Sequence, residues 1–254
     1  MPLVLRCADV HGTLASVAAL LDVDPTVLQL NLPGAVAVAN QDPDDPIRAL
    51  AASVADACGA TARRPDEIRY FHGTRTADAT SFVAAGLRPL AESLDSIWQQ
   101  LAELAPEVPT HEMDRLREAM TSGLAGPHTY PLRVADARLH GGPYGHLVLE
   151  PLLQPRDYSS WDYLAGPEIV VDICQAIEAR FAIDIASRYD LATRPCIVEF
   201  GMPADHLEGA IASALWYLEA ASRGERTTNA RWGYDGCGRS VPAASIRDVT
   251  FPER

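Results

Sequence analysis

Apolar residues recur at helical spacing near the start of the chain. The residues that share one helical face between positions 13 and 30 are Leu14, Val17, Leu20 and Leu21. The Asp24-Pro25 pair then starts a second short helix, with proline in a favoured first-turn position. A third amphipathic helix is predicted from residue 47 to a stop near Gly59. The pattern therefore predicts a helical N-terminal extension over residues 1–65.

Short β-prone runs and helices alternate from residue 66 onward. The runs at 68–72, 145–149, 196–200 and 246–249 are predicted strands. The predicted helices are 78–85, closed by Gly86, then 167–186 and 204–221. Residues 90–123 have an apolar face at helical spacing and form a predicted helical insert. This alternation predicts one α+β domain over residues 66–254, built on a small sheet.

Composition narrows the class of protein. A chain of 254 residues with 48% hydrophobic content can bury a substantial core. No stretch approaches the roughly 18 to 20 apolar residues that cross a bilayer, and the N-terminus lacks a secretory layout, so we expect a cytoplasmic protein without membrane contact. The five cysteines are widely spaced and form no C-x-x-C pair, which indicates small buried hydrophobes rather than disulfides.

The net charge of −13 disfavours nonspecific binding of nucleic acid. The spacing at residues 13–30 resembles a helix-turn-helix, but its second helix, residues 26–31, carries no Arg or Lys with which to contact bases and phosphates. Packing, or contact with a protein partner, is the favoured role of these N-terminal helices.

One segment combines a β-run with candidate chemistry. Tyr70-Phe71-His72-Gly73-Thr74-Arg75 places a His-Gly pair at the end of a predicted strand, directly before a helix. The pattern F-H-G-T-x(7)-F-x(3)-G-L-x-P, which continues to Pro89, resembles the first motif of the ADP-ribosyltransferase superfamily, in its diphtheria-toxin-like, poly(ADP-ribose)-polymerase-like and rifampin-modifying branches. The triplet His11-Gly12-Thr13 repeats three of these letters without the flanks, and there we expect Thr13 to be a helix N-cap.

The resemblance implies an ADP-ribosyltransferase-like split small β-sheet core and NAD as substrate. In the family, the glycine that matches Gly73 bonds the nicotinamide carboxamide, and the histidine that matches His72 bonds a ribose hydroxyl. A glycine suits this task because its backbone N–H and C=O approach the carboxamide without a Cβ clash. Thr74 and Arg75 are candidate contacts to ribose or pyrophosphate, since the guanidinium fork of arginine matches phosphate geometry.

The family also places a tyrosine against the nicotinamide face. Two residues offer it here, Tyr130 and Tyr144. Tyr144 is preferred because the surrounding glycines leave room for a flat ligand and a predicted strand follows directly.

The third family motif supplies a glutamate that bonds the nicotinamide ribose and stabilises the cation formed as nicotinamide leaves. This chain departs from that pattern, because no glutamate lies shortly before the expected closing strand. The shortlist for the catalytic acid is Asp235, then Glu225, then Glu199.

Other patterns carry less weight. His128, His140 and His146 match no zinc signature, and we expect no metal site. The chain lacks G-x-G-x-x-G, P-loop and G-x-S-x-G motifs. The aromatic and acidic residues between 157 and 168 are typical of either a substrate surface or a lid over the core.

The resemblance thus implies an NAD-dependent mono-ADP-ribosyltransferase that modifies a macromolecule, either protein or nucleic acid, in the manner of a bacterial toxin or defence effector. Two alternatives stay open on the sequence. One is an NAD glycohydrolase. The other is a non-catalytic ADP-ribosyltransferase-like scaffold that acts through protein contacts of its N-terminal helices and of the 90–123 insert.

Overall fold

The computed structural model describes residues 2–39, 41, 46–135, 141–205 and 207–253. They form helices and a small mixed sheet, so the predicted α+β class is confirmed. The chain divides into two compact units. The first comprises Met1–Phe71, Gly145–Trp161 and Glu199–Tyr234, and the second comprises His72–Tyr144, Asp162–Val198 and Asp235–Arg254.

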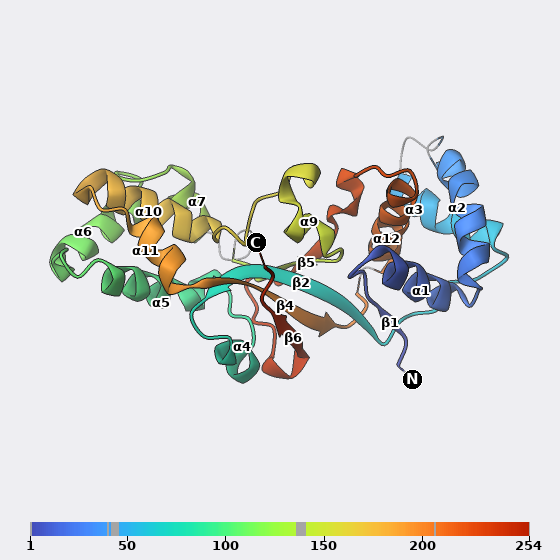
Figure 1. Cartoon of the computed structure of the whole chain (residues 1–254), viewed down its shortest axis with the longest axis horizontal. Coiled ribbons are helices and arrows are strands. Elements are labelled where there is room, and N and C mark those ends of the chain that lie inside the picture. The colour runs from blue at the N-terminus through green and yellow to red at the C-terminus, as the bar shows by residue number, and fades with distance from the viewer. Residues whose placement is uncertain (1, 40, 42–45, 136–140, 206, 254) are drawn as a thin grey trace. The chain divides into compact units, whose positions relative to one another are not determined.

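The first unit joins the N-terminal helices to a helix from the C-terminal third of the chain. Its helices are α1 (Val10–Leu21), α2 (Pro25–Ala39), α3 (Pro46–Ala57), the short α9 (Glu150–Leu153) and α12 (Leu207–Ser222), with 3-10 turns at Pro155–Tyr158 and Thr228–Arg231. The central helix α12 is buried from Ala210 to Ala220 and packs against α1 and α3 (Figure 1). The predicted boundary after residue 65 therefore lies inside this unit, because the N-terminal helices share their apolar core with α12.

The start of α1 differs from the sequence prediction. The N-cap is Asp9, whose Oδ1 accepts a hydrogen bond from the Gly12 backbone N–H at 2.7 Å. Thr13 instead lies inside the helix and donates its hydroxyl to the Asp9 carbonyl at 2.6 Å. The predicted Thr13 cap is thus wrong, because an aspartate at the preceding extended position supplies the acceptor that a helix start needs.

Most helices of the second unit surround an apolar core of their own. The helices of this unit are α4 (Thr80–Ala85), α5 (Leu90–Leu104), α6 (Thr110–Thr121), α7 (Thr129–Ala135), α10 (Glu168–Phe181) and α11 (Ile185–Ala192). A 3-10 turn lies at Ala243–Ser245. Trp98, Leu101, Met120, Tyr130 and Ile173 are buried together in this core. Figure 1 shows that α5, α6, α7, α10 and α11 lie together. The residues 90–123, predicted as a helical segment, form the two helices α5 and α6.

The sheet has the strand order β5-β3-β2-β4-β6, with β1 pairing in parallel with β2. Its strands are β1 (Val4–Leu5), β2 (Glu67–Thr76), β3 (Tyr144–His146), β4 (Arg194–Met202), β5 (Gly233–Asp235) and β6 (Ile246–Thr250). Strand β2 continues beyond the predicted run at 68–72, because the nine-residue strand β4 offers it a longer hydrogen-bonding edge. Gly73 therefore lies within a strand rather than at its end.

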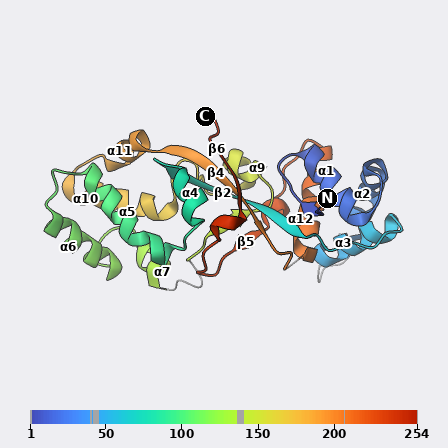
Figure 2. The same ribbon diagram turned by 90° about the horizontal axis from the view of Figure 1, so that it is seen from below.

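Gly86 closes α4 as predicted. Its φ of 77° is one that glycine adopts without strain. The next residue, Leu87, exchanges two backbone hydrogen bonds with Val241, at 3.0 and 2.8 Å. A Cβ added at Gly86 would lie 2.0 Å from the Val241 carbonyl oxygen, so only glycine fits this approach. The contact holds α4 beside β6, as Figures 1 and 2 both show.

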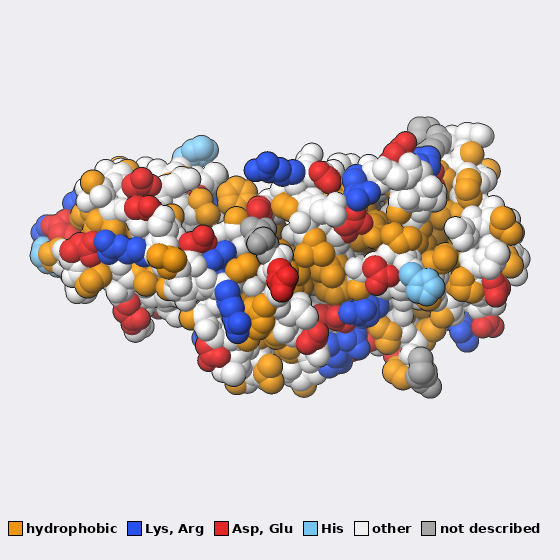
Figure 3. All heavy atoms as spheres, viewed as in Figure 1, with side chains coloured by type: hydrophobic (Ala, Val, Ile, Leu, Met, Phe, Trp, Pro, Cys, Tyr) orange, Lys and Arg blue, Asp and Glu red, His pale blue; other side chains and the backbone are white. Residues whose placement is uncertain are grey.

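The surface carries mixed charges. Figure 3 shows acidic side chains and arginines interspersed on the face in view, with apolar side chains between them. No single helix among the described residues is long and apolar enough to cross a membrane, although α1 and α2, which meet at 91°, pass such a test as a bent pair.

Candidate active site

The second unit contains a cavity of about 460 Å³ beside the second half of β2. Four of the residues predicted from the sequence line it, namely His72, Gly73, Thr74 and Tyr144. Its apolar wall includes Phe82, Leu87, Leu90, Ile97 and Ile169. The cavity has the size and the mainly apolar lining of small-molecule sites, with few polar groups to orient a ligand.

The His72 imidazole is held in one orientation at the wall of this cavity. Its Nδ1 lies 2.7 Å from the backbone carbonyl oxygen of Tyr144. Burial lowers the pKa of His72, so the ring is neutral at neutral pH. Because a carbonyl only accepts hydrogen bonds, the proton of the neutral ring is on Nδ1. Its Nε2 is then an acceptor, which suits a ligand hydroxyl.

Two tyrosines from distant parts of the sequence line the same cavity. Tyr144 begins β3 and is 39% exposed, and Tyr163 precedes α10. Burial raises the pKa of both phenols, that of Tyr163 to about 12, so both are neutral hydrogen-bonding groups at physiological pH. The cavity therefore offers two aromatic rings to a flat ligand.

A carboxylate lies in the wall of the cavity at the start of α10. Glu168 pairs through Oε2 with Nη1 of Arg133, whose Nε donates to Asp172 at 3.1 Å. Thr129 donates to the same Asp172 oxygen. The Oε1 atom of Glu168 takes no part in this pairing with Arg133. Arg133 thus fixes the orientation of Glu168 and leaves one carboxylate oxygen for a ligand.

Arg75 lies outside the cavity lining, although it belongs to the motif. Its guanidinium donates to the carbonyl oxygens of Leu164, Asp190 and Thr193 and to the Thr193 hydroxyl, at 3.0 to 3.1 Å. It also pairs with the Asp190 carboxylate at 2.7 Å, and its side chain is 7% exposed. These contacts occupy the guanidinium, so Arg75 ties β2 to α11 and to the loop before α10.

We expect Arg75→Gln to lower the free energy of unfolding by about 2 to 4 kcal/mol, because buried carbonyl groups lose their donors. Denaturant titration measures the effect. Arg115→Gln is the matched control, since Arg115 is 66% exposed and pairs with Glu112 on one helix, where an ion pair contributes about 0.5 kcal/mol or less. Equal stability of the two variants would contradict a structural role for Arg75.

Tyr130 lies in the helical core. It is fully buried and accepts a hydrogen bond from Nε1 of Trp98 at 2.9 Å. The two rings meet edge to face, with centroids 6.3 Å apart. Of the two tyrosines considered from the sequence, Tyr144 alone lines the cavity, because the apolar face of α5 covers Tyr130.

Asp235 and Glu225 lie outside the cavity lining as well. Asp235 ends β5 and accepts a hydrogen bond from the Cys237 backbone N–H at 2.8 Å, which fixes a tight turn. Its charge helps to raise the pKa of Tyr144, so it lies near that phenol. Glu225 belongs to the first unit, where it is exposed and pairs with Arg223 at 2.9 Å.

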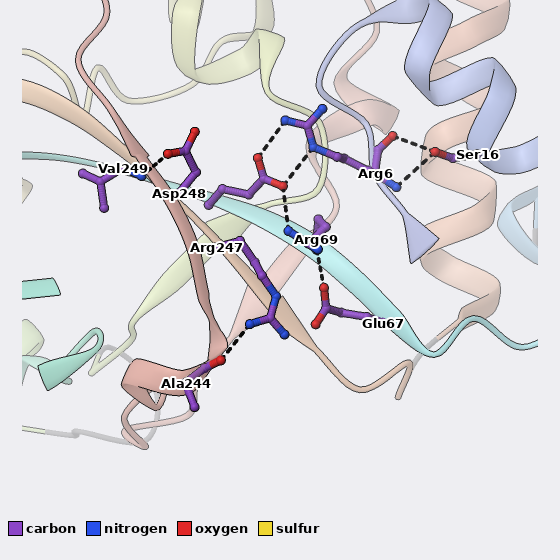
Figure 4. A network of polar contacts seen from close by, with 9 residues as sticks. Arg6, Ser16, Glu67, Arg69, Ala244, Arg247, Asp248 and Val249 are labelled. Carbon is purple, nitrogen blue, oxygen red and sulfur yellow. Dashed lines mark hydrogen bonds and ion pairs between the residues drawn. The ribbon is translucent and has the colours of Figure 1, made fainter. Parts of the chain in front are cut away.

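Glu199 is part of an ion-pair network in the first unit. Arg6 binds it with two hydrogen bonds, of 2.9 and 2.8 Å, and Arg69 adds a third at 3.1 Å. Arg69 also pairs with Glu67 (Figure 4). The Glu199 side chain is 9% exposed, and arginines occupy both of its oxygens. This arrangement joins β1, β2 and β4, which is a structural role.

The histidines considered for metal binding belong to different parts of the structure. His146 lies in the first unit and His128 in the second, while His140 is outside the described residues. In the parts of the chain that the structure describes, no group of three or more His, Cys, Asp or Glu side chains could hold a metal ion.

Glu168, Arg133 and Tyr163 were not predicted as site residues from the sequence. A signal was present for two of them, because Glu168 and Tyr163 belong to the aromatic and acidic segment at 157–168. Periodicity could not show which members of that segment line a cavity, since this depends on the packing of α10 against other helices such as α7.

Comparison of the chain with protein-family models, with curated proteins and with solved structures finds no match.

Proposed function

We propose that this protein binds NAD in the cavity and transfers ADP-ribose from it to a macromolecular acceptor. One observation carries the proposal. His72 and Gly73, which the motif assigned to NAD, line one cavity with Tyr144, although some 70 residues separate them in the chain. If the His-Gly dipeptide stood in a buried strand by chance, there would be no reason for it to line a cavity together with Tyr144.

In this proposal the nicotinamide end of NAD lies between the aromatic side chains. Gly73, within β2, bonds the carboxamide through its backbone, and Tyr144 packs against the ring. Nε2 of His72 accepts a hydrogen bond from a ribose hydroxyl. His72 can do so because Tyr144 holds its other nitrogen and burial keeps the ring neutral.

Glu168 is the proposed catalytic acid, in place of the three candidates from the sequence. When the bond between ribose C1 and the nicotinamide nitrogen breaks, its electron pair leaves with nicotinamide and positive charge develops on the ribose. The fixed carboxylate of Glu168 stabilises that charge. An acceptor oxygen or nitrogen then bonds to C1 and loses its proton, so no oxidant or reductant takes part.

The test is an incubation of the protein with NAD labelled in the adenylate part, together with a bacterial lysate. We expect release of nicotinamide and entry of label into macromolecules. Digestion with protease or nuclease then identifies the acceptor class. Free ADP-ribose as the sole product would indicate an NAD glycohydrolase. Binding of NAD in calorimetry without turnover would indicate a scaffold, and the absence of NAD binding would refute the proposal.

A further inference from the structure

We propose that Arg88 forms an anion subsite of the cavity and binds the diphosphate of NAD, an inference that rests on the proposed function. The sequence motif gave this role to Arg75, but the guanidinium of Arg75 is buried and occupied by protein groups. A diphosphate therefore needs another cation.

The charges around the cavity single out Arg88. Within the described parts of the chain, the charged residues that line the cavity are Arg88, Arg133 and Glu168. Arg133 is neutralised by Glu168 and by Asp172. Arg88 is exposed, and its guanidinium has no hydrogen bond or ion pair with any described residue. Counting only the described residues, it is thus the positive charge of this lining that has no partner, in a chain whose net charge is −13.

The backbone around Arg88 is fixed on both sides. Leu87, before it, exchanges two hydrogen bonds with Val241. Pro89, after it, is the N-cap of α5, and the Leu90 N–H donates to the Gly141 carbonyl at 2.7 Å. Arg88 therefore projects from an ordered connection between α4 and α5. A cation on a fixed backbone loses less conformational entropy when it binds a ligand.

Arg88 and the negatively charged Glu168 belong to different segments of the chain. Glu168 begins α10, whereas Arg88 lies between α4 and α5, so the two come from different elements that line the cavity. A ligand that develops positive charge on its ribose at one end and carries a diphosphate further along matches this arrangement. An arginine suits the diphosphate because its planar fork bonds two phosphate oxygens at once.

The experiment compares Arg88→Gln with the unchanged protein by calorimetry, using NAD, nicotinamide riboside and inorganic pyrophosphate. Nicotinamide riboside lacks phosphate. We expect the dissociation constant of NAD to rise about 10- to 100-fold in the variant and that of nicotinamide riboside to stay the same. Pyrophosphate binding should disappear, and Arg88→Lys should restore part of the NAD affinity. The loss for NAD should shrink at high salt.

Several outcomes distinguish this inference from the proposed function. Equal NAD affinity of Arg88→Gln and the unchanged protein would overturn the subsite and leave the function intact. An equal loss for NAD and nicotinamide riboside would also overturn it, because the effect would then not arise from phosphate. If the unchanged protein binds pyrophosphate but not NAD, the subsite stands and the NAD function fails. Binding of neither ligand overturns both.

Discussion

Glu168→Gln should lower the rate of nicotinamide release by about 10²- to 10³-fold while leaving the dissociation constant of NAD within about threefold. The physical reason is that glutamine keeps the shape of the side chain but removes the negative charge, which acts mainly on the cation that forms as the bond breaks. The ground state loses little, so the effect belongs to kcat rather than to binding. Rapid quantification of released nicotinamide, with calorimetry for NAD, measures both quantities.

The controls for Glu168 come from the acids that the sequence favoured. Glu225→Gln changes an exposed carboxylate of the first unit, and Asp235→Asn changes a carboxylate near Tyr144 but outside the cavity lining. We expect both to keep nicotinamide release within about threefold of the unchanged protein. A normal rate in Glu168→Gln, together with a large loss in Asp235→Asn, would move the catalytic role to Asp235. Thermal melting of each variant checks that the fold is intact.

His72→Ala should abolish detectable nicotinamide release and raise the dissociation constant of NAD about 5- to 150-fold. The affinity loss corresponds to a hydrogen bond and its desolvated partner, about 1 to 3 kcal/mol. The rate falls further because the ribose loses its orientation relative to Glu168. His72→Gln should retain part of the affinity, since its amide oxygen can accept the same ribose hydroxyl.

The chain supplies its own control for His72. His11 lies in the same His-Gly-Thr triplet but is exposed in the first turn of α1, which belongs to the first unit, whereas the residues that line the cavity belong to the second. His11→Ala should therefore leave NAD affinity and turnover unchanged. If His72→Ala releases nicotinamide at the normal rate, the proposed function is refuted.

Local sequence patterns determined much of the secondary structure. The helical spacing of the apolar residues predicted α1, α3, the pair α5 and α6, and α10, because one buried face dictates that spacing. Gly86 was predicted as a helix end for a reason that the structure confirms, namely a positive φ that glycine tolerates. The aromatic β-run before the second His-Gly-Thr triplet and the helix after it favoured His72, which lines the cavity, over His11, which does not line it.

Tertiary structure alone decided which of the candidate residues share a site. Arg75 and Thr74 are neighbours in the motif, yet β2 points them to different surroundings, because alternate side chains of a strand lie on opposite faces. Glu199 had the pattern of a lone acid in an apolar strand, and only the fold places Arg6 and Arg69 around it. Glu168 and Tyr144 lie 24 positions apart, a separation that no periodicity connects. Whether distant residues lie in one site depends on how helices and strands pack against one another. A local sequence pattern depends only on which face each helix or strand buries.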